Sequence, residues 1–76
     1  MYTDAMRRAF HNIQAPTNFN ISIVDNEHFL TLKLDERSFL PLKHDEKIDA
    51  VKYIAAVKKA LEMEGAIVLV TREPLK

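Results

Sequence analysis

The sequence predicts a small two-layer α+β domain, in which one mixed sheet has two helices packed mainly on one face. Two patterns lead to this prediction: apolar residues recur at helical spacing over 2–14 and 45–64, and they alternate with polar residues in between. The third observation is the length, because 76 residues leave room for a single hydrophobic core. The expected order of elements is therefore α-β-β-(β)-α-β in one domain over 1–76, where the bracketed strand is short.

The first helix is predicted over Tyr2–Gln14. Thr3 is the expected N-cap, and Asp4 in the first turn complements the positive end of the helix dipole. Pro16 limits the helix, since proline disfavours helical geometry in the residue before it. Four apolar side chains then share one face and are expected in the core: Tyr2, Met6, Phe10 and Ile13.

A β-hairpin is predicted from Phe19 to Leu34, because the apolar period changes there from helical to two. Its turn is expected at Asp25-Asn26, residue types that tolerate the backbone angles of tight turns. A short third strand is expected over 38–42, where Pro41 cannot donate a ladder hydrogen bond and so demands an edge position. The hairpin would bury Phe19, Ile21, Ile23, Leu30, Leu32 and Leu34.

The longest element is a helix predicted over Asp45–Glu64, followed by the only glycine of the chain, Gly65, as a left-handed C-cap. Its apolar stripe comprises Ala50, Val51, Ile54, Val57 and Leu61. A last strand over 66–71 is apolar on both faces, and residues 72–76 are expected to form a frayed tail. Since the helix reverses the chain direction, the last strand is expected parallel to the first and beside it, in the strand order 3-2-1-4.

The composition excludes several classes of function. Eleven Lys and Arg balance eleven Asp and Glu, so the chain lacks the basic surplus of typical nucleic-acid binders. Cysteine is absent, which removes disulfide scaffolds, thiol nucleophiles and cysteine-ligated zinc. One glycine cannot build a phosphate-cradling loop, and the longest apolar run, Ala66–Val70, is too short to span a membrane. We expect a cytoplasmic protein without a cofactor, a membrane contact or a small-molecule substrate.

The histidines show no pattern typical of catalysis or metal binding. None of His11, His28 and His44 lies four residues from another histidine or an acid, which is the spacing of a helical zinc motif. The acidic residues directly after His44 are interpreted as a helix start, where negative charge complements the dipole. The chain is therefore expected not to be an enzyme, with no catalytic, metal or cofactor residues.

The predicted sheet has more apolar side chains than one face can bury. If the leucines of the second strand face the helices, period two sends Val24 and Phe29 to the other side. The last strand adds either Ile67 and Leu69 or Val68 and Val70 to this outer face, and the sequence does not decide which. An exposed apolar strip usually marks an interface, and we assign the interface to Val24, Phe29, Val68 and Val70. The competing interpretations are that one helix covers each face, or that scattered exposed apolar residues are simply tolerated.

The preferred functional hypothesis is a small accessory or regulatory module that binds a protein partner, including a second copy of itself through a sheet face or edge. An edge position for the last strand would favour such pairing, because unpaired strand edges recruit other strands. The alternative hypothesis is a nucleic-acid-binding module that uses Arg7, Arg8 and His11 on the first helix. The size alone is compatible with an accessory protein of a phage or mobile element, and no residue supports that origin.

Overall fold

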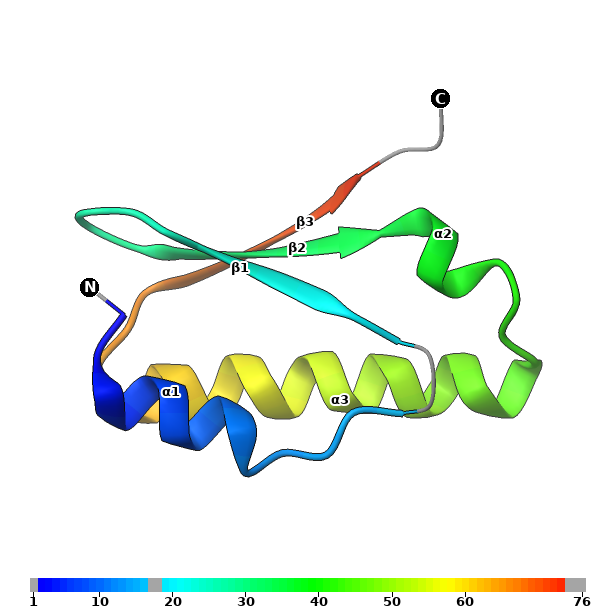
Figure 1. Cartoon of the computed structure of the whole chain (residues 1–76), viewed down its shortest axis with the longest axis horizontal. Coiled ribbons are helices and arrows are strands. Elements are labelled where there is room, and N and C mark those ends of the chain that lie inside the picture. The colour runs from blue at the N-terminus through cyan, green and yellow to red at the C-terminus, as the bar shows by residue number, and fades with distance from the viewer. Residues whose placement is uncertain (1, 17–18, 74–76) are drawn as a thin grey trace.

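The structure is a computed structural model that describes residues 2–16 and 19–73 (Figure 1). Over these ranges the chain forms three helices and a three-stranded mixed sheet in the order α-β-β-α-α-β. The elements are α1 (Asp4–His11), β1 (Ile21–Asp25), β2 (Leu30–Asp35), α2 (Glu36–Phe39), α3 (His44–Met63) and β3 (Val68–Glu73). The α+β class predicted from the sequence is confirmed.

α1 begins at the predicted cap. The Thr3 hydroxyl accepts a hydrogen bond from the backbone N–H of Met6 over 3.1 Å, which satisfies one of the free donors at the helix start. The helix ends at His11, earlier than predicted, because the N–H of Ile13 bonds back to the carbonyl oxygen of Phe10 and tightens the chain into a turn. The short helix buries Met6 against α3 and leaves its basic residues exposed.

β1 and β2 form the predicted hairpin. They pair antiparallel, with Ile23 opposite Leu32. The N–H of Asn26 donates to the carbonyl oxygen of Phe29 over 2.9 Å and closes the turn where the residue types predict it. Alternation along β2 buries every second side chain, namely Leu30, Leu32 and Leu34.

Residues 38–42 do not form the predicted third strand, and that prediction is wrong. Asp35 instead caps α2, because its Oδ1 accepts the backbone N–H two residues further on over 2.9 Å. Pro41 then stops the helix, since it has no N–H to continue the hydrogen-bond series. α2 holds the ring of Phe39 edge-on to the ring of Phe19, with centroids 4.9 Å apart.

Both ends of α3 have defined caps. At the start, Oε1 of Glu46 accepts the backbone N–H of Lys43 over 2.9 Å. At the other end, Gly65 has a φ of 97° and is the left-handed residue that the sequence predicts. Over the described ranges, no helix combines the length and the apolar character needed to cross a bilayer.

The buried side of α3 differs from the predicted stripe, of which Ile54 is only partly buried. Val51, predicted to be buried, is 59% exposed. Tyr53 is buried instead, because its ring packs edge-on against that of Phe19 with centroids 6.2 Å apart. The buried residues of the helix are Ala50, Tyr53, Val57 and Leu61.

β3 lies at one edge of the sheet and pairs with β2 in parallel, with Leu30 opposite Val68. The predicted strand order 3-2-1-4 is therefore wrong, since the last strand lies beside β2 and not beside β1. The physical reason is that α3 carries the chain back along the sheet between these two strands, a crossover that joins neighbouring parallel strands. Residues 72 and 73 extend β3 beyond the predicted end, and the rest of the predicted tail, 74–76, lies outside the described residues.

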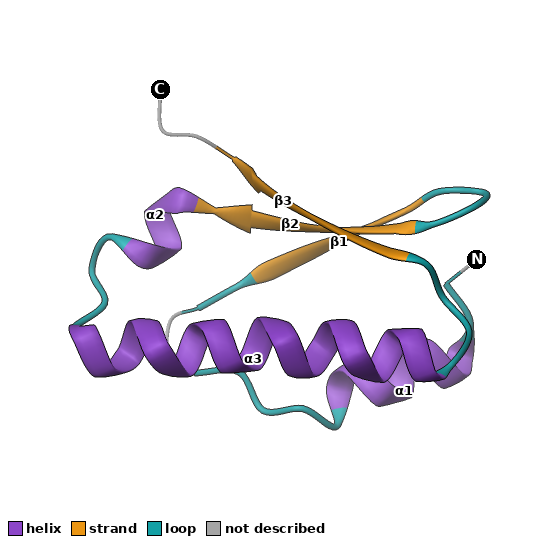
Figure 2. Cartoon of the chain, turned by 180° about the vertical axis from the view of Figure 1, so that it is seen from behind, coloured by secondary structure: helices purple, strands orange, loops and turns teal. Residues whose placement is uncertain are grey.

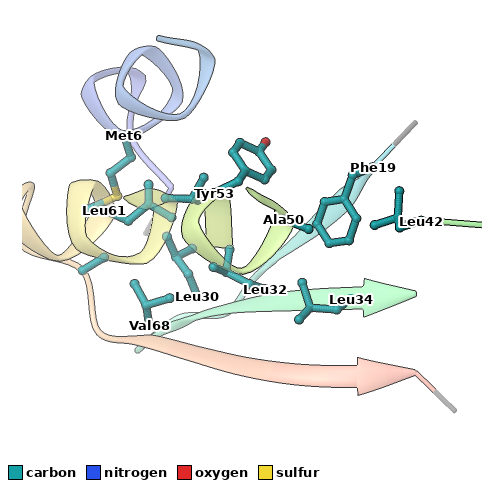
Figure 3. Packing of buried hydrophobic residues seen from close by; sticks show 12 residues of the cluster. Met6, Phe19, Leu30, Leu32, Leu34, Leu42, Ala50, Tyr53, Leu61 and Val68 are labelled. Carbon is teal, nitrogen blue, oxygen red and sulfur yellow. The ribbon is translucent and has the colours of Figure 1, made fainter. Parts of the chain in front are cut away.

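α1 and α3 lie on the same face of the sheet, as Figures 1 and 2 show from opposite sides. The core fills the space between these helices and the sheet (Figure 3). It comprises Met6, Phe19, Leu30, Leu32, Leu34, Leu42, Ala50, Tyr53, Val57, Leu61, Ala66 and Val68. The two-layer prediction is confirmed, and the competing interpretation with one helix on each face is wrong. Neither of these helices covers the other face of the sheet.

Candidate protein interface

The face of the sheet that points away from α1 and α3 carries an apolar surface. The register aligns Val24 of β1 with Thr31 of β2 and Leu69 of β3 in one row across the sheet. Val24 and Leu69 are 44% and 47% exposed, and Ile67, two residues before Leu69, is 62% exposed. Phe29, directly before the buried start of β2, is partly exposed, and alternation places it on the same face. We define Val24, Phe29, Ile67 and Leu69 as the open-face patch.

Two of the four interface residues predicted from the sequence do not lie on this face. Val68 pairs with a buried leucine of β2 and is 6% exposed, so its assignment to an exposed strip is wrong. Val70 has the same parity and points to the helix side, where it is 39% exposed because it lies at the sheet edge. Ile67 and Leu69, the pair that the sequence left open, take the outer positions.

The C-terminal end of α3 decides which side of β3 is buried. The N–H of Gly65 donates to the carbonyl oxygen of Glu62 over 3.0 Å, and the N–H of Ala66 donates to that of Leu61 over 3.1 Å. This pair of bonds brings the second residue beyond the helix against its last turn, and Ala66 is buried there. Alternation then turns residue 67 outward and residue 68 inward. An alanine directly after the capping glycine was the signal in the sequence that identifies the outer pair.

Polar side chains border the open-face patch without covering it. The other strand residues on this face include Ser22, Thr31, Lys33, Asp35 and Thr71. Two of these strand residues are charged: Lys33 is half-buried, and Asp35 is exposed at the end of β2. The centre of this face is therefore apolar with neighbouring hydroxyl groups, and its charged groups lie toward the end of β2.

The basic residues of the alternative hypothesis, Arg7, Arg8 and His11, are exposed on α1. The Arg7 guanidinium carbon lies 5.8 Å from the ring centroid of Tyr2, and partial burial raises the pKa of that phenol. The ring of His11 is edge-on to that of Phe10 at 5.7 Å, and Arg8 complements the negative end of the helix dipole. Each side chain thus has a local structural role, and the three polar groups stay accessible.

The acidic and histidine side chains do not gather into a site. Over residues 2–16 and 19–73, no group of three such side chains could hold a metal ion. His28 lies 3.9 Å from Glu27 beside the hairpin turn, where both are exposed. The carboxylate of Asp25 accepts the N–H of Tyr2 over 3.1 Å, and this hydrogen bond lowers the pKa of Asp25. That contact attaches the start of the chain to the hairpin.

A surface depression of about 530 Å³ lies on α3. It is lined by His44, Lys47, Ile48, Val51 and Lys52, which recur at spacings of three and four residues along one helix. The depression is therefore the space between long side chains on one side of α3. It offers no polar groups from a second element that could orient a substrate.

Comparisons of this chain with family models, with curated proteins and with solved structures find no match. The register and exposure of the open-face patch describe an apolar surface bordered by hydroxyl and charged groups.

Proposed function

We propose that the chain is a small non-enzymatic module that binds a protein partner through the open-face patch and acts as an accessory or regulatory component. The observation that carries the proposal is the placement of α1 and α3 on one side of the sheet, which leaves Val24, Ile67 and Leu69 exposed together on the other. Contiguous exposed apolar surface of this kind usually marks an interaction site. A cytoplasmic location remains a prediction from the sequence.

The size of the open-face patch limits the binding free energy that it can supply. Full burial of a Val, Leu or Ile side chain contributes about 1.5–3 kcal/mol, so covering three that are about half exposed would contribute roughly 3 kcal/mol. A micromolar complex needs about 8 kcal/mol. The open-face patch can therefore be the apolar centre of an interface, and the partner must also contact the polar border or an edge of the sheet.

Leu69→Asp tests this proposal directly. The substitution places a charge at the centre of the patch on a side chain that the fold does not bury, so the domain should stay folded while partner binding weakens at least about tenfold. The measurement is quantitative capture from a lysate of the native host on immobilised protein, with and without nuclease. Circular dichroism checks that the variant is folded.

Met63→Asp is the matched control, because Met63 is equally apolar and 78% exposed but lies on α3, away from the sheet face. It should retain the partner. Equal retention by both variants would contradict the open-face patch. Retention that disappears with nuclease would favour the alternative hypothesis, in which Arg7 and Arg8 contact phosphate groups.

A further inference from the structure

The outer edge of β3 presents unpaired backbone groups in a regular pattern. The carbonyl oxygen of Ile67 accepts the N–H of Leu30 over 2.9 Å, which shows that the odd-numbered residues of this segment bond toward β2. In a parallel ladder the intervening residues direct their N–H and C=O groups away from that neighbour. The backbone N–H and C=O groups of Val68, Val70 and Arg72 therefore point away from β2. No strand among residues 2–16 and 19–73 pairs with this edge.

Over residues 68–71 this edge lacks the features that usually protect strand edges. Its pairing with β2 runs without a bulge from Val68 to Glu73, and residues 68–71 contain neither proline nor charge. Val70 lies at the middle of the edge, points to the helix side and is still 39% exposed. An added strand would cover this side chain, which α3 leaves partly open.

The neighbouring side of α3 carries apolar side chains beside the charged pair Lys58 and Glu62. Tyr53 faces Phe19 and thus the β1 side of the molecule. Helical geometry places Ile54 and Val51 on the opposite side, toward β3. Ile54 is only partly buried and Val51 is 59% exposed. The space beyond the edge of β3 is therefore bordered by apolar groups from the strand above and from α3 below.

We infer that the occupant of this edge is a second copy of the chain, which adds its own β3 antiparallel across a two-fold axis at Val70. In that register the N–H and C=O groups of Val70 bond to Val70 of the second copy, and those of Val68 bond to Arg72 of the second copy. Every outward-facing backbone N–H and C=O group of these three residues thus has a hydrogen-bond partner in the second copy. The pairing also keeps both helix layers on one side of a continuous sheet.

The charges near the edge favour this occupant. The Lys58 Nζ and the Glu62 Oε2 lie 3.2 Å apart and pair within the chain. Helical spacing from Ile54 places both on the β3 side of α3. A copy related by a two-fold axis presents this pair in reverse order, so each charge can meet its opposite and not its like. Arg72 brings no unpaired charge, because its Nε lies 2.7 Å from Glu36 Oε1 within its own chain. The formal net charge of zero adds no long-range repulsion between two copies.

This inference deepens the proposed function and rests on it in one respect, the assignment of the chain to protein binding. The two-fold pairing leaves the open-face patches exposed and brings those of both copies onto the same side of one wider sheet. A dimer can therefore form with or without the external partner. The two ideas can fail separately, since one depends on the edge of β3 and the other on its open face.

Sedimentation equilibrium of the purified chain, from low to high micromolar concentration, tests the inference. The wild type should reach the mass of two chains. Val70→Pro removes the outward N–H and no bond to β2, and should weaken the dimer at least about tenfold because both copies lose a hydrogen bond. Val70→Lys is the second variant, since a charge pointing inward at an edge opposes strand addition while its long stem stays compatible with the fold.

Leu69→Lys is the matched control, because it makes the same chemical change one residue away on the opposite face. It should leave the dimer intact. Amide hydrogen exchange adds a readout without mutation: Val68, Val70 and Arg72 should gain protection as the concentration rises, while Leu69 and Thr71 should be protected throughout. A wild type that stays monomeric, or a dimer that survives both Val70 variants, would overturn the inference. So would a dimer lost only in Leu69→Lys, which would locate self-association on the open face.

Discussion

At Gly65 the backbone has a φ of 97°, a conformation that residues with a Cβ rarely adopt. Gly65→Ala should destabilise the protein by about 1–2 kcal/mol, because a Cβ comes too close to the backbone carbonyl oxygen in the left-handed conformation. An added Cβ would meet no atom within 4 Å, so this cost is in the backbone and not in a clash. Urea unfolding measures the difference.

Gly65→Asn is the control for that substitution. Asparagine tolerates left-handed angles better than alanine, so it should recover part of the lost stability. If alanine and glycine proved equally stable, the helix would not need a left-handed residue at its end. The position matters beyond α3, because the hydrogen bonds of Gly65 and Ala66 to the last turn set which side chains of β3 point inward.

The four-residue helix α2 depends on one side chain. Asp35→Ala removes the carboxylate that accepts the backbone N–H of Arg37 in the first turn of α2, and should reduce the free energy of unfolding by about 1 kcal/mol. Because α2 carries Phe39 onto Phe19, part of the loss would arise from looser ring packing. Chemical denaturation provides the measurement. Asp35→Asn keeps an acceptor and should stay close to wild type, whereas equal losses would contradict capping as the cause.

The elements differ in how far the sequence determines them. The hairpin and α3 could be predicted because their apolar periods extend over many residues and both end in recognisable turn or cap residues. α2 could not be predicted from the apolar pattern. The cap formed by Asp35 favours a helix more strongly than the short apolar alternation over 38–42, which contains Pro41, favours a strand. On α3, Tyr53 and Val51 exchange places because an amphipathic ring can be buried when an aromatic neighbour such as Phe19 receives it.

Strand order and the finer details of the interface depend on tertiary contacts. The position of β3 beside β2 follows from the crossover through α3. Local sequence patterns do not determine this strand order. Val24 and Phe29 could be placed on the open face because their hairpin fixes the alternation. Val68 and Val70 could not be separated from Ile67 and Leu69 by periodicity, because the chain is apolar at every position from 67 to 70.

At the scale of the whole molecule, two helices cover only one face of the sheet. The chain has no cysteine for a disulfide, and residues 2–16 and 19–73 hold no cluster of metal-binding side chains that could add stability. A second copy at the β3 edge should therefore contribute measurably to thermal stability. Linkage predicts that the midpoint of unfolding rises with protein concentration, by about 3–5 °C for a tenfold increase in a domain of this size. Differential scanning calorimetry over a tenfold concentration range measures this slope.

Val70→Pro supplies the comparison, because it should unfold at a midpoint that does not depend on concentration. Its midpoint should agree with that of the wild type at high dilution, where the wild type is also a monomer. A wild-type midpoint that does not change with concentration would mean that each chain is stable alone. An equal slope in both proteins would mean that association occurs at a surface other than the β3 edge, with the open-face patch as the next surface to alter.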